Sequence, residues 1–333
     1  MSDSRLRLEK FLSARNQPSS VEQLTPDAST REYFRVGWNG DSAIACVYPE
    51  SFSAQNQSYL DVTNLFLTSN LPVAEIYDFD ETLAVIILED FGDVILRDVL
   101  LKSDEAKRER LTNEAVGLIA KVQAATAKAF ELDSIASRLK FDEEKLLWEL
   151  NFFKTHYFET FRKFKLSEAD DQALAAEFVA LSAELESRAA VLCHRDFHAA
   201  NLMIDADERL RIIDHQDARI GSAAYDLVSL LLDRVLETPD EQSLNDKKRL
   251  LLREREKLDL PPLDFAIFDE EFQLQTVQRC LKAVGTFSFQ SVVRGKTYFI
   301  PFIAPTLRIV WQTCRRINRF PALRTIIERH LNP

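Results

Sequence analysis

The chain has 333 residues, 46% of them hydrophobic, and a formal net charge of −11. This length and apolar content allow one large or two modest domains with a substantial core. The acidic balance argues against nucleic acid as a partner, because binding a phosphate backbone requires an excess of basic residues. The charged N-terminal segment and the absence of an apolar run near about 20 residues predict a cytoplasmic protein without membrane contact.

The first 90 residues alternate short apolar strands with helices. Asn39-Gly40-Asp41 separates two alternating runs, which is a strong hairpin signal. The elements expected here are a helix (4–15), a hairpin (31–38 with 42–48), a second helix (54–69) and a second strand pair (76–79 with 83–88). This order predicts a small β-rich N-lobe over residues 1–90 that covers a nucleotide.

The composition changes at Glu89-Asp90-Phe91-Gly92-Asp93, where polar residues and a glycine follow an apolar strand. We interpret this segment as a hinge. Beyond it the patterns predict mostly helices, at 104–128, 142–165, 168–188, 223–236, 240–257, 269–290 and about 304–330. The fold class expected is α+β, with a larger helical C-lobe over residues 91–333.

The central segment carries chemistry. His194-Arg195-Asp196 is followed by Asn201, five residues after the Asp, and by Asp214, eighteen residues after it. Phosphoryl-transfer enzymes of the protein-kinase type use this spacing for a base and a metal ion. Residues 201–205 and 209–214 read as a β-hairpin that pairs position 201 with position 214. Two oxygen ligands would then meet at its open end, as Mg²⁺ requires, while Asp196 accepts a proton from a hydroxyl.

Two simpler interpretations compete with this one. His-Arg-Asp occurs by chance, and an apolar hairpin with one Asp is common core material. Cys193, His194 and His198 could also suggest zinc, although a second ligand pair at the usual spacing is missing. Tyr225-Asp226-Leu227 at the head of an apolar helix makes the kinase pattern more specific, because Asp226 is expected to accept hydrogen bonds from the loop backbone.

Taken together, these motifs resemble the aminoglycoside phosphotransferase-like branch of the protein-kinase superfamily. Within it they are most similar to bacterial cell-wall sugar kinases that phosphorylate N-acetylmuramate and N-acetylglucosamine at the anomeric hydroxyl. The matching stretches are Asp27–Arg35, Ile87–Asp93, Cys193–Leu202, Ile213–Ala218, Tyr225–Ser229 and Gln278–Phe287. The resemblance implies a bilobal protein-kinase-like fold.

The resemblance also implies roles for individual residues. Asp196 would be the catalytic base, and Asn201 and Asp214 would bind Mg²⁺. The residues implied for ATP are Ser29 and Thr30 in the phosphate-covering turn, and Glu89, Asp90 and Phe91, which would meet the adenine through backbone groups. His215 stands where the family usually has Phe, which alters packing but keeps the metal ligand.

One departure concerns the phosphates. Kinases usually place a Lys on the third strand, paired with a helix Glu, whereas this chain has Cys46 or Val47 there and no lysine between Lys10 and Lys102. Arg31 is the candidate replacement, because a guanidinium can bind two phosphate oxygens at once. The alternative for Arg31 is a solvated loop side chain.

The function expected is therefore an ATP- and Mg²⁺-dependent kinase of a small-molecule hydroxyl acceptor, an amino sugar of the cell wall. A kinase of another small alcohol or aminoglycoside, or a nucleotide-binding pseudokinase, remains open. Glu149 and Arg279 are expected in buried salt bridges, and Trp148 and Trp311 in the core instead of against a sugar.

Overall fold

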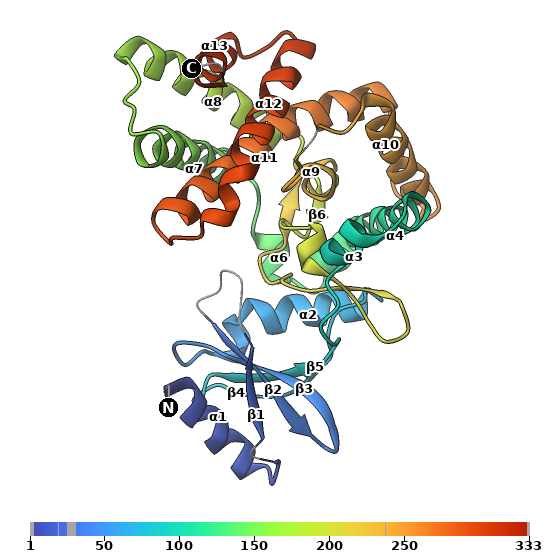
Figure 1. The fold of residues 1–333 in the computed structure, drawn as a ribbon. Coiled ribbons are helices and arrows are strands. Elements are labelled where there is room, and N and C mark those ends of the chain that lie inside the picture. The colour runs from blue at the N-terminus through green and yellow to red at the C-terminus, as the bar shows by residue number, and fades with distance from the viewer. Residues whose placement is uncertain (1–2, 19, 25–30, 237, 332–333) are drawn as a thin grey trace. The chain divides into compact units, whose positions relative to one another are not determined.

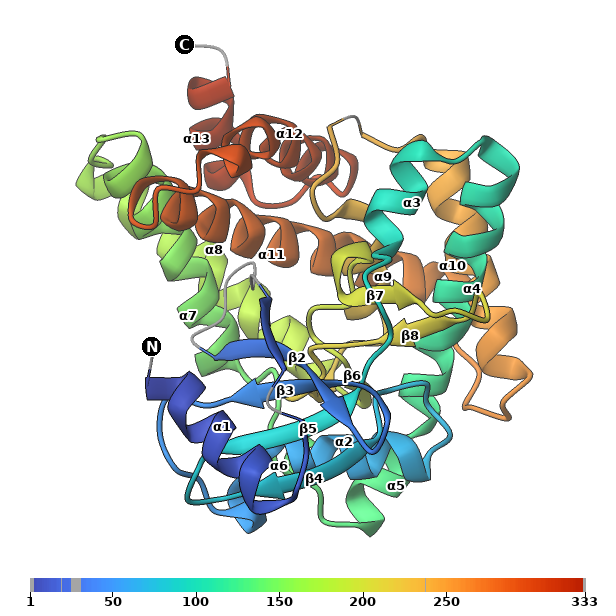
Figure 2. The ribbon, with the colours of Figure 1, turned by 60° about the horizontal axis from the view of Figure 1, so that its bottom comes forward.

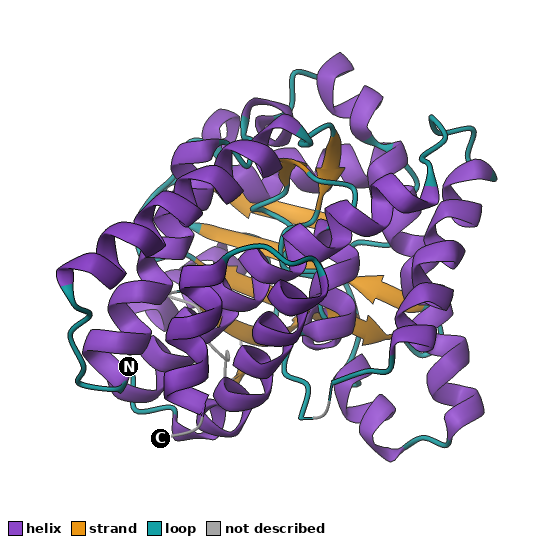
Figure 3. Cartoon of the chain, turned by 90° about the horizontal axis from the view of Figure 1, so that it is seen from above, coloured by secondary structure: helices purple, strands orange, loops and turns teal. Residues whose placement is uncertain are grey.

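The computed structural model describes residues 3–18, 20–24, 31–236 and 238–331. Contacts divide the chain into two compact units, one of Met1–Asp104 with Ala199–Asp217 and one of Glu105–His198 with Ala218–Pro333. The first unit holds a small antiparallel sheet and the second is mostly helical, which confirms the α+β class (Figure 3). The hairpin of residues 202–212 belongs to the β-rich unit, because this division follows the contacts between residues. The functional boundary at residue 90 stays a prediction.

The sheet of the β-rich unit has five antiparallel strands in the order β1-β2-β3-β5-β4. Both predicted hairpins form, and the tight turn between β2 and β3 has Asn39 and Gly40 at φ 52° and 96°, the left-handed conformation that a two-residue hairpin loop needs. Strand β1 was not predicted, because it is only four residues long and half polar. The strands are β1 (Val21–Leu24), β2 (Glu32–Trp38), β3 (Asp41–Val47), β4 (Ile76–Asp80) and β5 (Val85–Glu89).

Side chains alternate between the two faces of this sheet. Helix α1 (Asp3–Ala14) packs Leu8 and Phe11 on the face that carries Ala45 and Ile87. Helix α2 (Ser58–Thr68) lies on the opposite face, where its Tyr59 meets the residues of the other parity, Cys46, Ile86 and Leu88 (Figure 1). The sheet is therefore covered by a helix on each face, and most residues of β3 and β5 are buried.

The central segment forms the expected antiparallel β-hairpin, made of β7 (Leu202–Ile204) and β8 (Leu210–Ile212). Its register differs from the prediction by one residue. Leu202 pairs with Ile212, and Ile213 donates to the carbonyl of Asn201, so position 201 faces 213 instead of 214. The reason is the turn, where Asp205 accepts from the backbone N–H groups of Asp207 and Arg209 and centres the loop on Asp207.

The first unit also contains short helical pieces. These are the 3₁₀ turns η1 (Ala54–Asn56) and η3 (Ala199–Asn201) and the helix α3 (Leu96–Lys102), which follows the hinge.

Helix α11 (Phe265–Val292) is the longest element of the helical unit, and 18 of its residues are buried. Helices α7, α9 and α12 pack along it (Figure 2). The unit's helices are α4 (Glu105–Ala124), α5 (Thr126–Glu131), α6 (Ile135–Arg138), α7 (Glu143–Phe153), the π-helix η2 (Lys154–Phe161), α8 (Glu168–Ser187), α9 (Tyr225–Leu232), α10 (Glu241–Glu256), α11, the 3₁₀ turn η4 (Thr297–Phe299), α12 (Ile300–Arg316) and α13 (Pro321–Leu331). A short two-stranded sheet joins β6 (Val191–Cys193) to β9 (Arg219–Gly221).

The helical predictions at 142–165 and about 304–330 differ in detail. The helix expected over 142–165 becomes a π-helix at Lys154 and ends at Phe161. The helices expected over about 304–330 are α12 and α13, separated where Asn318 and Phe320 adopt φ 51° and 56°. Helix α12 begins at Ile300 with Pro301 in its first turn, a position where the missing N–H costs nothing. Among the described residues, no helix combines the length and apolar character that crossing a membrane requires.

Glycine at position 285 of α11 permits a close helix crossing. A Cβ there would lie 2.7 Å from the Cα of Phe153 and 3.0 Å from its backbone N. Backbone atoms cannot move aside as a flexible side chain can. The approach of α7 to α11 therefore depends on this glycine.

We expect Gly285→Ala to lower the free energy of unfolding by roughly 1–3 kcal/mol, the usual cost of overpacking. Gly117→Ala on α4 is the matched control, since a Cβ added at this position would meet no described atom within 4 Å and alanine favours a helix by about 0.5–1 kcal/mol. Urea unfolding midpoints should thus move in opposite directions. A neutral or stabilising Gly285→Ala would contradict the close crossing.

Candidate active site

Asn201 and Asp214 lie together at the open end of the central hairpin. The amide Nδ2 of Asn201 is 3.4 Å from Oδ2 of Asp214, and Gln216 donates to the other carboxylate oxygen at 2.8 Å. Asp214 has a φ of 62°, a conformation that costs a non-glycine residue about 1–3 kcal/mol. This turn of the backbone breaks the strand alternation, so the two side chains meet although the register is shifted by one residue.

His215 fixes this end of the hairpin to helix α2. Its ring is fully buried between Tyr59 and Phe66, at centroid distances of 5.0 and 5.2 Å. Its Nε2 lies 2.7 Å from the hydroxyl of Thr63. Histidine here packs like an aromatic ring and adds a hydrogen bond to Thr63, so the exchange for Phe alters the packing, as expected.

Arg31 reaches the same carboxylate. Its Nη2 is 3.3 Å from Oδ1 of Asp214, and its side chain is only 14% exposed. The guanidinium lies against the rings of Tyr33 and Tyr48, 5.8 and 5.7 Å from their centroids. Arg31 is therefore an ion-paired, largely buried side chain, and the solvated-loop alternative is wrong.

Arg31 lies near the strand position at which kinases usually carry a lysine. Tyr33 pairs with Cys46 in the sheet, and every second residue along a strand lies on the same face, so Arg31 and Cys46 belong to the same face. Burial raises the pKa of the Cys46 thiol to about 11, while the nearby Arg31 cation opposes this shift. The structure thus has a guanidinium beside the strand position where kinases carry an ammonium.

The side chains of the hinge are engaged in ion pairs. Arg35 contacts Asp90 at 2.7 Å and Asp93 at 2.8 Å. Arg211 of β8 contacts Glu89 at 2.7 Å and lies 3.9 Å from the centroid of the Phe91 ring. These contacts fix the side chains of residues 89–93. The contact of adenine with the backbone of Glu89, Asp90 and Phe91 stays a prediction. Ser29 and Thr30 lie outside the described residues.

The helical unit contains the loop that carries Asp196. The carboxylate of Asp226, at the start of α9, accepts from the backbone N–H groups of His194 at 2.7 Å and Arg195 at 3.0 Å. This confirms the expected contact from Asp226 to the loop backbone. Burial raises the pKa of Asp226 to about 6, although the His194 side chain and the two N–H groups favour its charged form.

Asp196 is surrounded by cations. Its Oδ1 is 2.8 Å from Nζ of Lys282 and 3.4 Å from Nη2 of Arg279, and Arg195 lies 3.9 Å from Oδ2. Burial by itself would raise the pKa of Asp196, but Lys282, followed by Arg195 and Arg279, holds it well below its ordinary value. The carboxylate is therefore ionised at neutral pH and can orient a hydroxyl.

Arg279 links the loop to helix α9. The same Nη2 donates to Ser229 at 3.0 Å and contacts Asp233 at 3.3 Å. The expected buried ion pair of Arg279 is confirmed. The roles of Lys282 and Asp233 were missed, although polar residues at 278, 279 and 282 inside a long apolar helix were a usable signal.

Glu149 and Trp148 occupy neighbouring positions on α7 but differ in surroundings. Glu149 is 1% exposed, accepts from Gln278 at 2.9 Å and lies 3.8 Å from Lys145, so its buried ion pair is confirmed. Trp148 is 55% exposed, with the Lys145 ammonium 4.2 Å from its ring centroid. The expectation of a core position was wrong for Trp148, because its position on α7 faces solvent.

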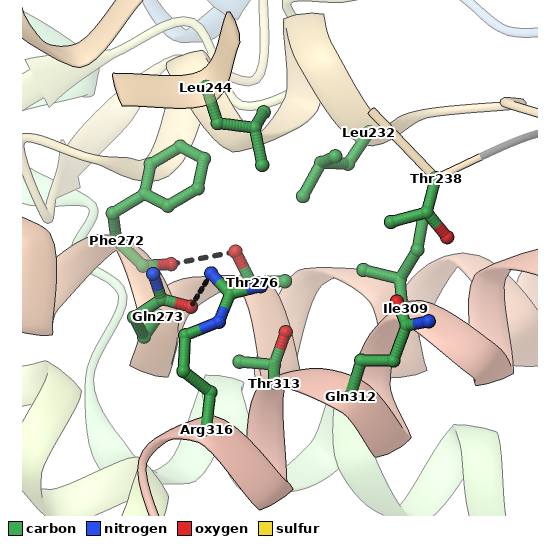
Figure 4. Close-up of a pocket in the computed structure, with 10 residues that line it drawn as sticks. All are labelled: Leu232, Thr238, Leu244, Phe272, Gln273, Thr276, Ile309, Gln312, Thr313 and Arg316. Carbon is green, nitrogen blue, oxygen red and sulfur yellow. Dashed lines mark hydrogen bonds between the residues drawn. The ribbon is translucent and has the colours of Figure 1, made fainter. Parts of the chain in front are cut away.

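A small pocket lies between the residues after α9 and helices α11 and α12 (Figure 4). Arg316 extends over it toward Gln273, and the hydroxyl of Thr276 bonds back to the carbonyl of Phe272. Its cavity volume of about 10 Å³ admits no more than one water molecule. It is too small to hold a sugar.

The oxygen atoms of Asn201 and Asp214 fit a hard cation. Within the described ranges, no cluster of three or more His, Cys, Asp or Glu side chains could hold a metal ion. Mg²⁺ does not need such a cluster, because it is bound through one or two protein oxygens together with phosphates and water. An amide and a carboxylate that meet at one hairpin end are a suitable donor set.

The chain is similar to known proteins. A family model described as "Phosphotransferase enzyme family" matches residues 20–261. The chain belongs to this family. It is therefore a phosphotransferase, and the hairpin between Asn201 and Asp214 lies within the matched range.

Two curated relatives resemble this phosphotransferase over most of both chains. The N-acetylmuramate/N-acetylglucosamine kinase of Neisseria meningitidis is 29% identical, covering 90% of this chain and 87% of the relative. The protein of the same name from Caulobacter vibrioides is 26% identical, covering 95% and 85%.

Solved structures support the fold. The choline kinase LicA from Streptococcus pneumoniae is 14% identical with a TM-score of 0.60, covering 93% of this chain and 99% of that one. A LicA structure with AMP has a TM-score of 0.61 at 13% identity, covering 94% and 100%. The phosphotransferase thus has a protein-kinase-like fold.

Proposed function

We propose that this phosphotransferase is an ATP-dependent kinase of an amino sugar, and that it phosphorylates the anomeric hydroxyl of N-acetylmuramate or N-acetylglucosamine. The observation that carries the acceptor is the similarity to relatives of that name over about nine tenths of the chain. The AMP bound by the structurally similar LicA supports an adenine nucleotide as donor. The presence of Asp196, Asn201 and Asp214 together favours an enzyme, because a nucleotide-binding pseudokinase does not need all three.

In this proposal Asp196 orients the acceptor hydroxyl and receives its proton. The acceptor oxygen forms a bond to the γ-phosphorus, and the bond from that phosphorus to ADP breaks with its electron pair leaving on ADP. The low pKa of Asp196 suits a transition state with a loose phosphoryl group, in which the proton moves late. Mg²⁺ held by Asn201 and Asp214 would neutralise phosphate charge.

The acceptor is tested by ADP release against a panel of amino sugars, amino alcohols and aminoglycosides, with NMR of each product to identify the phosphorylated oxygen. We expect turnover of N-acetylmuramate or N-acetylglucosamine with phosphate on the anomeric oxygen. Turnover of aminoglycosides or choline without the sugars would reject the acceptor. Nucleotide binding without turnover of any alcohol would favour the pseudokinase.

Asp196→Ala should abolish transfer and leave ATP binding largely intact, because the base contacts the acceptor and not the nucleotide. Loss of a positioned base lowers kcat by roughly 10²–10⁴-fold. Asp214→Asn should instead weaken binding of Mg·ATP, measured by calorimetry at several Mg²⁺ concentrations. Near wild-type turnover by Asp196→Ala would show that its role is assigned wrongly.

Arg31→Ala should raise the KM for ATP by roughly tenfold, equal to about 1.4 kcal/mol of lost charge-assisted contact with phosphate. Arg15→Ala is the control, since Arg15 pairs with Asp78 and lies over the ring of Phe11. That variant should keep the wild-type KM. Equal ATP kinetics for Arg31→Ala and wild type would leave the metal and backbone amides as the phosphate counter-charge.

A further inference from the structure

Lys282 on α11 has no role in the proposed mechanism, although its ammonium lies 2.8 Å from Oδ1 of Asp196, closer than Arg279 and Arg195. The side chain is 13% exposed and comes from a position 86 residues further along the chain. Within the described residues, Nζ of Lys282 donates a single hydrogen bond, the one to Asp196. An ammonium has three N–H donors, so two remain for another acceptor.

Orientation of Asp196 alone does not require Lys282. Arg279 contacts the same Oδ1 at 3.4 Å and is itself held by Ser229 and Asp233. A second cation on this oxygen makes Asp196 a weaker proton acceptor, and burying an ammonium is unfavourable. If Lys282 served only to hold Asp196 in place, the free-energy cost of burying its ammonium would have no explanation.

The distances bring Lys282 within reach of the reacting atoms. A hydroxyl that donates to Oδ1 of Asp196 at about 2.7 Å would lie at most about 5.5 Å from Nζ. The oxygens of a phosphoryl group joined to that hydroxyl extend further, and the flexible lysine stem can follow them. Negative charge on these oxygens needs cationic donors in the transition state.

We propose that Lys282 is a catalytic residue that donates a hydrogen bond to the phosphoryl group as it reaches the acceptor oxygen, while Arg279 keeps Asp196 in position. This rests on the proposed role of Asp196 in phosphoryl transfer. The proposal requires Lys282 to keep its proton: burial, followed by Arg279, lowers the pKa of its ammonium, and the carboxylates of Asp196 and Glu149 oppose that shift. The hydroxyl proton still passes to Asp196, and the electron pair of the broken bond still leaves on ADP.

The test compares Lys282→Ala and Lys282→Arg with wild type, using any alcohol of the panel that supports ADP release. Lys282→Ala should lower kcat by roughly 10²–10³-fold, as loss of a donor to a developing charge does, with the KM for ATP within about twofold. Lys282→Arg should recover part of the loss. Lys154→Ala is the matched control, because Lys154 is a part-buried lysine paired with Asp171 at 2.7 Å; it should keep wild-type kcat.

The pH profile separates a catalytic from a structural role. The charged and titratable groups that face Lys282 and Asp196 are Glu149 on α7, Arg195 and His198 on the loop, and Arg279 on α11. Asp233, which follows α9, faces Arg279 and His198, and Arg234 faces His198. Removing only the Lys282 cation should raise the pKa of Asp196 and move the acidic limb of kcat/KM to higher pH. Wild-type kcat and an unmoved acidic limb in Lys282→Ala would overturn the proposal.

Binding of the product distinguishes failure of this inference from failure of the proposed acceptor. Wild type should bind N-acetylglucosamine 1-phosphate more tightly than N-acetylglucosamine, and Lys282→Ala should lose that preference. An unchanged preference in the variant would overturn the role of Lys282. Wild type that binds neither compound would reject the acceptor, and the kcat comparison with the alcohol that is turned over would still decide on Lys282.

Discussion

The carboxylate of Asp226 makes the contact on which the Asp196 loop of the helical unit depends. It accepts two backbone N–H groups, from His194 and Arg195, in a fully buried position. Arg195 has a φ of 86°, which an arginine adopts only where surrounding contacts compensate for the strain. By holding this turn, Asp226 determines the direction in which the next side chain, Asp196, leaves the loop. Loss of that carboxylate would leave two buried donors unsatisfied.

Charge is distributed differently from the usual kinase arrangement. The strand that would carry a lysine has Cys46, and the guanidinium of Arg31 approaches from the start of the neighbouring strand. In the helical unit two cations of α11, Arg279 and Lys282, meet the carboxylate of Asp196. Because charge stabilisation depends on distance and burial and not on sequence position, a family can move its cations between elements and keep its chemistry.

Much of the molecule could be predicted from local patterns. The turn Asn39-Gly40 and the alternation of β2 and β3 are short-range features that predicted the hairpin that forms, and the short spacing from Asp196 to Asn201 and Asp214 predicted the family. The hairpin register was wrong by one residue because Asp205 centres the turn on Asp207 through its side chain. A single side-chain contact can shift a pairing that the apolar pattern alone leaves undecided.

The sequence by itself determined the fold class, the catalytic motif and the family, since these depend on residue types at fixed short spacings. Only the tertiary structure decided which cations serve the two carboxylates. Arg31 meets Asp214 across 183 positions, and Lys282 meets Asp196 across 86. No periodicity relates residues so far apart. Their contact results from the packing of strands and helices, and this packing buries each cation beside its carboxylate.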